Sequence, residues 1–428
     1  MTNFELAKKY EEYTIATRNY LHEHPELSNQ EYETIKFIMA ELEKMGVEYV
    51  EIPEGGVLAT IRGTEDNGKS VMLRADCDAL PVLEKENLNC TRKVWSKNPG
   101  VMHACGHDAH TAMLLGAAKV LSEKRDEIKG TIYLIFERGE EGTGNVRYII
   151  PYCEKHGIRP DSIFGTHVSA LDPTGTIIIN DTDVLASAMG FTIEIEGLGG
   201  HGSRPDQSNS PIDCFVAIYH RLEALRLTKV NPFRTCTYSI GSLHAGERGN
   251  VIPQRITFSG TMRTFDPEGV GAAFYDAFKK TVDGMCETYD CKPKYIKFAK
   301  PGLATVNDIE YSKFAQLAVA EDIGDGKVIQ AEPWMGSESF SNYLKVWPGV
   351  FAFVGVQNLE KGCGAGHHNE RFDIDVDGLK YGVAAYVNYG LKALTTDIGP
   401  ASRPKDESYR DYALTMYGAE EVEKMYNC

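Results

Sequence analysis

Short loops of this 428-residue chain carry side chains that could bind metals or act as nucleophiles. The run CGHDAH at residues 105–110 places the thiol of Cys105 and the imidazole of His107 two positions apart. Side chains at i and i+2 of an extended segment point the same way, so both could face one centre. This spacing predicts metal ligation. Two alternatives stay open: a Cys105 nucleophile with His107 as its base, and a turn with a buried thiol.

Further polar groups lie at or just after apolar stretches that we expect to be buried strands. They are Asp76 and Asp78 after residues 71–75, Glu140 and Glu141 after 131–136, His167 within 163–168, and His367 with His368 after 349–354. Ligand sites in parallel α/β sheets lie beyond the carboxyl ends of the strands, so these loops are expected to converge. A thiol, imidazoles and a carboxylate form a mixed donor set that suits Zn, Mn, Co or Ni.

A second polar set lies further along the chain. His201 stands in a glycine-rich loop at residues 199–205, Asn250 precedes residues 251–253, and Arg263 lies in a predicted strand. An imidazole, an amide and a guanidinium could hold an acyl oxygen and a carboxylate. The alternative is that all three are turn and sheet-edge residues.

Helix and strand patterns alternate on both sides of a central segment. Helices are expected at residues 4–20, 29–45, 108–122 and 377–394, and strands at 57–61, 71–75, 131–136, 163–168 and 349–354. This alternation predicts an α/β domain whose mostly parallel sheet is covered by helices.

The central segment has the order β-α-β-β-α-β, which predicts a ferredoxin-like α+β domain. We expect residues 1–187 and 301–428 to form a discontinuous metal-binding catalytic domain, and 188–300 an inserted dimerisation or lid domain. Edge strands of such an insert can pair across a twofold axis, which predicts a homodimer or higher homo-oligomer. Residues 397–428 have helix-forming character and no recognisable chemistry.

The composition argues against some classes of partner. Asp and Glu number 61 against 45 Lys and Arg, a formal net charge of -16. Such a field repels phosphate backbones and anionic lipids, so we expect neither nucleic acid nor membrane as a partner. Ten cysteines without a CxxC pair indicate free thiols. Together with the lack of an apolar run of about 18 residues, they predict a cytoplasmic protein.

Six motifs occur together, in order and at fitting spacings. They are RNYLHEHPELS at 18–28, RADCDALP at 74–81, CGHDAH at 105–110, the pair Glu140-Glu141, GHG at 200–202 and NVIP at 250–253. In combination they resemble the aminoacylase/carboxypeptidase family of dinuclear metalloamidases. Within it they are most similar to the branch of hippurate hydrolase, auxin-conjugate hydrolases and N-acetyldiaminopimelate deacetylase. The likeness covers about residues 15–395.

The resemblance implies a site and an activity. Two divalent metal ions would be bound by Cys105, His107, Glu141, His167 and His368, the last because the branch places its ligand four residues before an aromatic, here Phe372. Glu140 would be the general base, Asp78 would orient a ligand, and His201, Asn250 and Arg263 would bind substrate, the first two across a dimer interface. The reaction would split an N-acyl amino acid or related small amide into a carboxylate and an amine. A dipeptidase or carboxypeptidase of the same family, or an inactive metal-binding relative, are the alternatives.

The chain departs from this branch at three places. Glu137-Arg138-Gly139 stands where Gln-Pro-Ala is usual, the loop after His167 lacks the usual aromatic and proline pattern, and Asn369-Glu370-Arg371 stands where a proline is common. These positions surround the expected acyl pocket, so the departures concern the choice of substrate.

Overall fold

The computed structural model describes residues 1–142, 144–324 and 326–427, which divide into two compact units. Unit 1 comprises Met1–Thr182, Val306–Glu332 and the chain from Ser339 onward. Unit 2 comprises Asp183–Thr305 and a short second segment, Pro333–Glu338. Unit 1 is therefore built from segments that lie on both sides of unit 2 in the sequence. None of the helices in the described ranges is long and apolar enough to cross a membrane.

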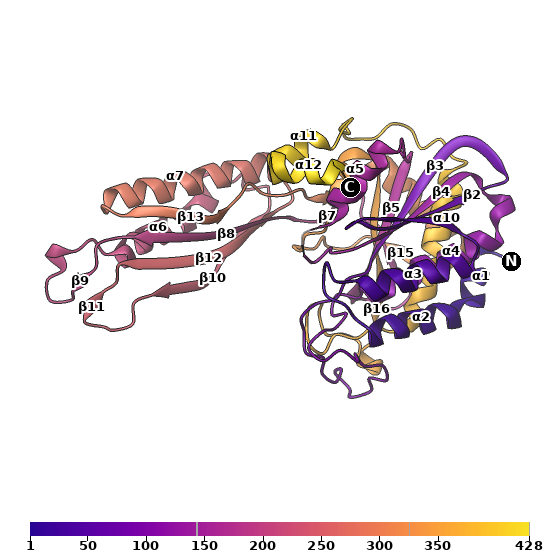
Figure 1. Ribbon diagram of the computed structural model, residues 1–428, viewed down its shortest axis with the longest axis horizontal. Helices are drawn as coiled ribbons and strands as arrows, with labels where there is room; N and C mark the ends of the chain where they lie inside the picture. Colours follow the sequence, from indigo (N-terminus) through magenta and orange to yellow (C-terminus); the bar gives the residue numbers. More distant parts are fainter. Residues whose placement is uncertain (143, 325, 428) are drawn as a thin grey trace. The chain divides into compact units, whose positions relative to one another are not determined.

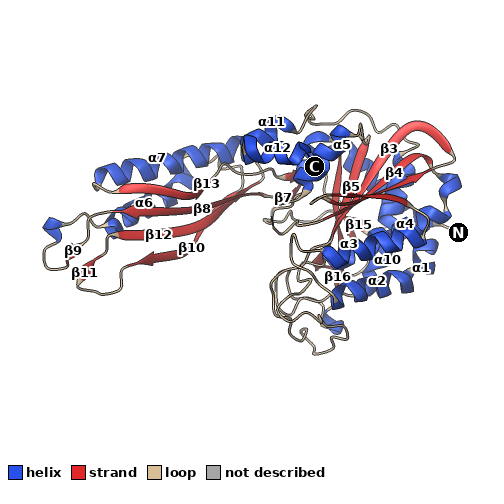
Figure 2. Ribbon diagram, viewed as in Figure 1, coloured by secondary structure: helices blue, strands red, loops and turns tan. Residues whose placement is uncertain are grey.

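Unit 1 is organised around an eight-stranded sheet (Figures 1 and 2). In spatial order its strands are β1 (Glu48–Ile52), β2 (Gly56–Arg62), β4 (Lys129–Glu137), β3 (Glu65–Asp76), β5 (Ser162–Pro173), β16 (Gly349–Gln357), β6 (Ile177–Ile178) and β15 (Val328–Ile329). The four central strands, β4, β3, β5 and β16, run parallel to one another. β1 and β2 are antiparallel at one edge. The predicted mostly parallel α/β sheet is confirmed.

Helices cover this sheet. They are α1 (Asn3–Lys9), α2 (Glu11–Glu23), α3 (Tyr32–Lys44), α4 (His107–Glu123), α5 (Val146–Lys155), α8 (Ile309–Ile323), α9 (Ser341–Val346), α10 (Leu379–Ala393), α11 (Arg410–Tyr417) and α12 (Ala419–Asn427). α4 and α10 pack against β3 and β5, whereas α5 packs against α9 and α12. β16 is buried along nearly its whole length, as a strand covered on both faces should be.

The helix expected at residues 4–20 is two helices. α1 ends at Lys9 and α2 begins at Glu11, because Tyr10 between them leaves helical geometry and its backbone N–H bonds back to Leu6. Thr2 and Glu5 form a capping box at the start of α1, which makes it a separate short helix. The apolar pattern runs through the break and conceals it.

Unit 2 has an antiparallel four-stranded sheet with two helices. Its strands, in spatial order, are β10 (Cys236–Ala245), β12 (Arg255–Thr264), β8 (Ser187–Glu196) and β13 (Lys292–Phe298), and its helices are α6 (Pro211–Thr228) and α7 (Ala272–Thr288). Burial alternates strictly along β8, so one face of the sheet packs on the helices. The chain order is the predicted β-α-β-β-α-β of a ferredoxin-like domain.

Two small pairings complete the topology. β9 (Gly200–His201) and β11 (Val251–Ile252) form an antiparallel ribbon within unit 2 (Figure 1). β7 (Asp183–Leu185) pairs with β14 (Thr305–Val306) where the chain enters and leaves the insert.

Candidate metal centre and active site

The site lies at the carboxyl ends of the parallel strands of unit 1. Asp76 ends β3 and pairs in register with Glu137 at the end of β4. His167 of β5 pairs with Phe353 of β16. Because these four strands are neighbours, the loops that follow them share one edge of the sheet, as the strand-end pattern predicted.

Cys105, His107 and Glu141 form the first cluster of potential ligands. One donor atom from each lies within 4.8 Å of the other two. The thiol and the imidazole face one centre through a left-handed turn at Gly106, whose φ is 93°, and not through the extended segment inferred from spacing. A Cβ at Gly106 would lie 2.4 Å from Val168 Cγ2, so the sequence requires glycine here.

Asp78 connects this cluster. Its Oδ1 lies 2.9 Å from His107 Nδ1, and its Oδ2 accepts hydrogen bonds from Ser28 Oγ at 2.6 Å and from the backbone N–H of Glu141 at 2.9 Å. One buried carboxylate thus fixes the ring of one candidate ligand and the main chain of another.

Two buried atoms of the cluster are consistent with a bound cation. His107 Nε2 has no hydrogen-bond partner among the described residues, and Glu141 Oε1 lies 2.9 Å from His368 Nε2. Burial alone would lower the pKa of His107, but the charges of Asp76 and the hydrogen bond to Asp78 raise it well above its usual range. A buried nitrogen without a partner, beside a thiol and a carboxylate oxygen that faces a second imidazole, is what a metal ion would satisfy.

His167 extends the cluster toward β16. Its Nε2 lies 3.4 Å from Cys105 Sγ, and its Nδ1 lies 2.7 Å from the carbonyl oxygen of Val168. Burial, together with the nearby rings of His110 and His367, lowers the pKa of His167 well below its usual value. The ring is therefore neutral, Nδ1 carries the proton, and Nε2 offers a lone pair toward Cys105.

His110 is near the same centre but has a structural role. One of its ring nitrogens is within 4.8 Å of donor atoms of His107 and His167. Its Nδ1, however, lies 2.6 Å from Asp76 Oδ1, and its Nε2 accepts the backbone N–H of Val168 at 2.8 Å. With both nitrogens engaged, His110 holds β5 against α4. The sequence offered a signal that was missed, because His110 follows His107 by three residues on one helix.

The structure brings both histidines of the final motif to the cluster. His368 Nε2 lies 2.9 Å from Glu141 Oε1, with φ of 63° at His368. His367 has a ring nitrogen within 4.8 Å of donor atoms of Cys105 and His167. Its Nδ1 is 3.2 Å from the carbonyl oxygen of Cys105, and its Nε2 accepts the N–H of Ala170 at 3.3 Å. His367 thus makes backbone contacts, while His368 faces the carboxylate.

Glu140 is next to the candidate ligand Glu141 and is held by a backbone group. Its Oε1 accepts the N–H of Ser339 at 2.8 Å. Burial raises the pKa of the Cys105 thiol, which His107 opposes, and the charges of Glu141 and Glu140 raise it further.

Glu137 is one of the residues at which the chain departs from the branch that it resembles. It belongs to a buried polar network that sequence reasoning missed. Arg74 Nε donates to Glu137 Oε2 at 2.8 Å, and Arg74 Nη1 donates to Asp76 Oδ2 at 2.8 Å. Glu137 also accepts hydrogen bonds from Ser339 Oγ at 2.7 Å and from Tyr343 Oη at 3.0 Å. A buried arginine requires such partners, so the unusual glutamate stabilises the end of β4.

The predicted substrate-binding residues all lie in unit 2. His201 and Asn250 are exposed on or beside the β9–β11 ribbon, where the carbonyl of Asn250 accepts the N–H of Gly202 at 2.9 Å. Arg255 begins β12 shortly after β11 of the ribbon ends. Arg263 lies eight residues further along β12, which corresponds to about 26 Å along a strand. One copy of unit 2 therefore does not bring Arg263 to the other two.

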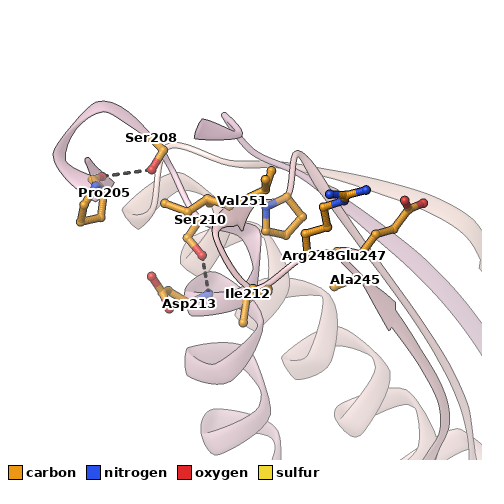
Figure 3. A pocket seen from close by; sticks show the side chains of 13 residues that line it. Pro205, Ser208, Ser210, Ile212, Asp213, Ala245, Glu247, Arg248 and Val251 are labelled. Carbon is orange, nitrogen blue, oxygen red and sulfur yellow. Dashed lines mark hydrogen bonds between the residues drawn. The ribbon is translucent and has the colours of Figure 1, made fainter. Parts of the chain in front are cut away.

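Each of these residues has local partners. Arg263 donates to Ser337 Oγ at 3.1 Å, and partial burial lowers the pKa of its guanidinium. His201 Nδ1 lies 2.7 Å from Ser203 Oγ. A cavity of about 560 Å³ lies beside the ribbon and is lined by residues that include Ser210, Arg248 and Val251 (Figure 3).

A helix-covered parallel sheet that gathers a thiol, imidazoles and adjacent carboxylates at its carboxyl edge defines a metal-dependent hydrolase. The model of Peptidase family M20/M25/M40 matches residues 72–392, and the chain belongs to this family. It is therefore an amidohydrolase that uses divalent metal ions, as the sequence resemblance implied.

Named relatives cover nearly the whole chain. Thermostable carboxypeptidase 1 of Saccharolobus solfataricus is 36% identical over 392 residues, which is 90% of this chain and 96% of that protein. N-acetylcysteine deacetylase of Bacillus subtilis is 34% identical over 89% of this chain and 97% of that protein. The solved structure of Bacillus subtilis YxeP, described as a dinuclear metal binding peptidase from the M20 family, is 30% identical, with a TM-score of 0.73 over 91% of this chain and all of that one.

Proposed function

We propose that this chain hydrolyses the amide bond of N-acyl amino acids to give a carboxylate and a free amine. The single observation that carries the proposal is the buried His107 Nε2, which has no hydrogen-bond partner among the described residues and belongs to a side chain that clusters with Cys105 and Glu141. Similarity to an N-acetylcysteine deacetylase over most of both chains supports the substrate class.

The proposed ligands are Cys105, His107, Glu141, His167 and His368, which would hold two divalent ions of Zn, Mn, Co or Ni. When bound, the ions lower the pKa of a water molecule and polarise the scissile carbonyl. The carboxylate of Glu140 takes the proton of the attacking water and gives it to the departing amine nitrogen. Asp78 accepts the Nδ1–H of His107, which leaves Nε2 as the ring atom that would bind a metal ion.

The choice of His368 as ligand is supported by how the two final histidines are bonded. Both nitrogens of His367 have backbone groups within hydrogen-bonding distance, whereas His368 Nε2 faces Glu141 Oε1. A nitrogen and an oxygen 2.9 Å apart are at a suitable separation for two ligands of one ion.

In the proposed enzyme, unit 2 supplies the substrate-binding groups. Arg263 would hold the substrate carboxylate, and His201 with Asn250 would come from the partner of a homodimer to bind the acyl oxygen. Support for an oligomer comes from the edge strand β10 and the neighbouring α6, which expose Leu243, Val216 and Tyr219. The nine described cysteines are free, which supports a reducing compartment and hence a cytoplasmic enzyme.

A carboxypeptidase is the second candidate, because Thermostable carboxypeptidase 1 is 36% identical to this chain. A Cys105 nucleophile is less consistent with the structure, because burial raises the pKa of its thiol, whereas an activated cysteine needs a lowered one. N-acyl amino acids and N-blocked dipeptides, each with a free or an amidated carboxyl group, separate the first two functions. A carboxypeptidase prefers the dipeptides and needs their free carboxylate.

The decisive experiment combines metal removal with a variant of the base. Chelated protein should lose hydrolysis and regain it with Mn or Zn. Glu140→Gln should keep its metal content but lose about 10²- to 10⁴-fold in kcat, whereas the exposed control Glu43→Gln should match the original protein. Full turnover by metal-free protein would reject the proposal.

A further inference from the structure

The C-terminal segment, residues 397–427, lies outside the residues that match the family, yet it is packed onto unit 1. Figure 1 shows α11 and α12 in yellow beside α5. Tyr409 is completely buried, and α12 packs against α5. Tyr426 Oη donates to Glu154 Oε2 of α5 at 2.7 Å. The segment is therefore part of the folded unit and contacts elements near the site.

Tyr409 joins the two elements that flank Glu140. Its backbone N–H donates to Glu154 Oε1 of α5 at 2.7 Å, and its hydroxyl donates to Asn342 Oδ1 of α9 at 2.8 Å. α5 begins five residues after Glu141, and α9 begins directly after Ser339 and Phe340. One tyrosine thus fixes both α5 and α9.

A continuous path of hydrogen bonds leads from this tyrosine to the carboxylate. Asn342 Nδ2, next to the atom that Tyr409 contacts, donates to the carbonyl oxygen of Ser339 at 2.9 Å. The N–H of Ser339 donates to Glu140 Oε1 at 2.8 Å. Three hydrogen bonds therefore connect the C-terminal segment to Glu140.

We propose that the C-terminal segment positions the general base, and that Tyr409 is the positioning residue. α9 has only six residues, and so short a helix is not stable without tertiary contacts. Its docking by Tyr409 fixes the carbonyl of Ser339 and, through the Cα of Ser339, the preceding peptide whose N–H orients Glu140. Since a base must sit within hydrogen-bond reach of the proton it removes, a small displacement of this peptide lowers the rate of the chemical step. The inference rests on Glu140 being the base of the proposed function.

The test uses two matched hydroxyl deletions in the full chain. Tyr409→Phe removes the bond to Asn342, and Tyr426→Phe removes a bond of similar length from the same segment to Glu154. With Mn-loaded protein and an N-acyl amino acid, Tyr409→Phe should lose about tenfold in kcat, with KM and metal content unchanged. Tyr426→Phe should lower the melting temperature about as much as Tyr409→Phe does, but it should keep the original kcat.

A second variant tests the path independently. Asn342→Ala should reproduce the loss in kcat, and the double variant with Tyr409→Phe should show no further loss, because both interrupt one path. Unchanged kcat in Tyr409→Phe and Asn342→Ala, or an equal loss in Tyr426→Phe, would overturn the inference alone. Full activity of metal-loaded Glu140→Gln would overturn the assignment of the base and this inference together.

Discussion

Asp78 and His107 are joined by a buried contact of 2.9 Å between Oδ1 and Nδ1, and the other carboxylate oxygen of Asp78 accepts the N–H of Glu141. One carboxylate thus positions the side chain of one candidate ligand, His107, and the main chain of another, Glu141. Asp78 also accepts a hydrogen bond from Ser28 Oγ, so both of its carboxylate oxygens face protein donors. Burial would raise the pKa of Asp78, but the hydrogen bonds from His107 and Ser28 lower it.

Replacing Asp78 should weaken metal binding without removing a ligand. Asp78→Asn replaces one carboxylate oxygen by an NH2 group, which donates hydrogen bonds. The asparagine side chain therefore cannot accept the hydrogen bonds from both His107 Nδ1 and the Glu141 N–H. We expect about a 10- to 100-fold loss of metal affinity, measured by titration of chelated protein. The exposed control Asp126→Asn should bind as tightly as the original chain. Equal affinity in Asp78→Asn would contradict the orienting role.

Glu137 should stabilise the fold through Arg74. Glu137→Gln removes the charge that faces the buried guanidinium, although Asp76 still pairs with it. We expect the free energy of unfolding to fall by about 2 kcal/mol, less than the loss of a sole partner would cost. Denaturant unfolding measures this, with Glu48→Gln, which breaks an exposed pair with Arg62, as a control that should change it by under about 1 kcal/mol.

Gly106 should be required for the site. Gly106→Ala combines a left-handed backbone with a Cβ placed 2.4 Å from Val168 Cγ2. Gly100→Ala has a similar φ of 88° but an open surrounding, so it tests backbone strain alone. We expect about 1 kcal/mol of destabilisation in the control. Gly106→Ala should in addition lose bound metal, as measured by elemental analysis. Normal metal content in both variants would show that the turn does not set the ligands.

The loop after β16 should be stabilised by Asp375 in a pH-dependent way. Burial would raise the pKa of Asp375, but hydrogen bonds from Lys361 and Asn358 lower it. A lowered pKa in the folded state means that the stabilisation is complete above the unfolded value of about 4 and is lost as pH falls toward the folded value.

Comparison of two asparagine variants tests this expectation. The difference in unfolding free energy between the original chain and Asp375→Asn should be constant from pH 7 to about 5 and shrink below about 4. Asp377→Asn, at a half-exposed carboxylate that also pairs with Lys361, should show a smaller difference. A difference that grows on acidification would refute the assignment.

The residue types and their spacing were sufficient to predict the class of chemistry. The motifs at residues 105–110 and 140–141 predicted a metal site, and the apolar strands predicted that their loops converge. The α/β fold with a ferredoxin-like insert followed from alternating patterns of local periodicity. These features are local, since side-chain type and strand or helix period are properties of a few consecutive residues.

Contacts between distant segments were decided only by the tertiary structure. It engages both nitrogens of His110, separates the contacts of His367 from those of His368, and joins Glu137 to Arg74. Ser339 reaches Glu140 across 199 residues of sequence, and Tyr409 reaches Asn342 across 67. No local period encodes such pairings, because they depend on which strands and helices become neighbours when the core closes. Sequence therefore determined which groups are present, and packing determined which of them are free to bind metal and which hold the others in place.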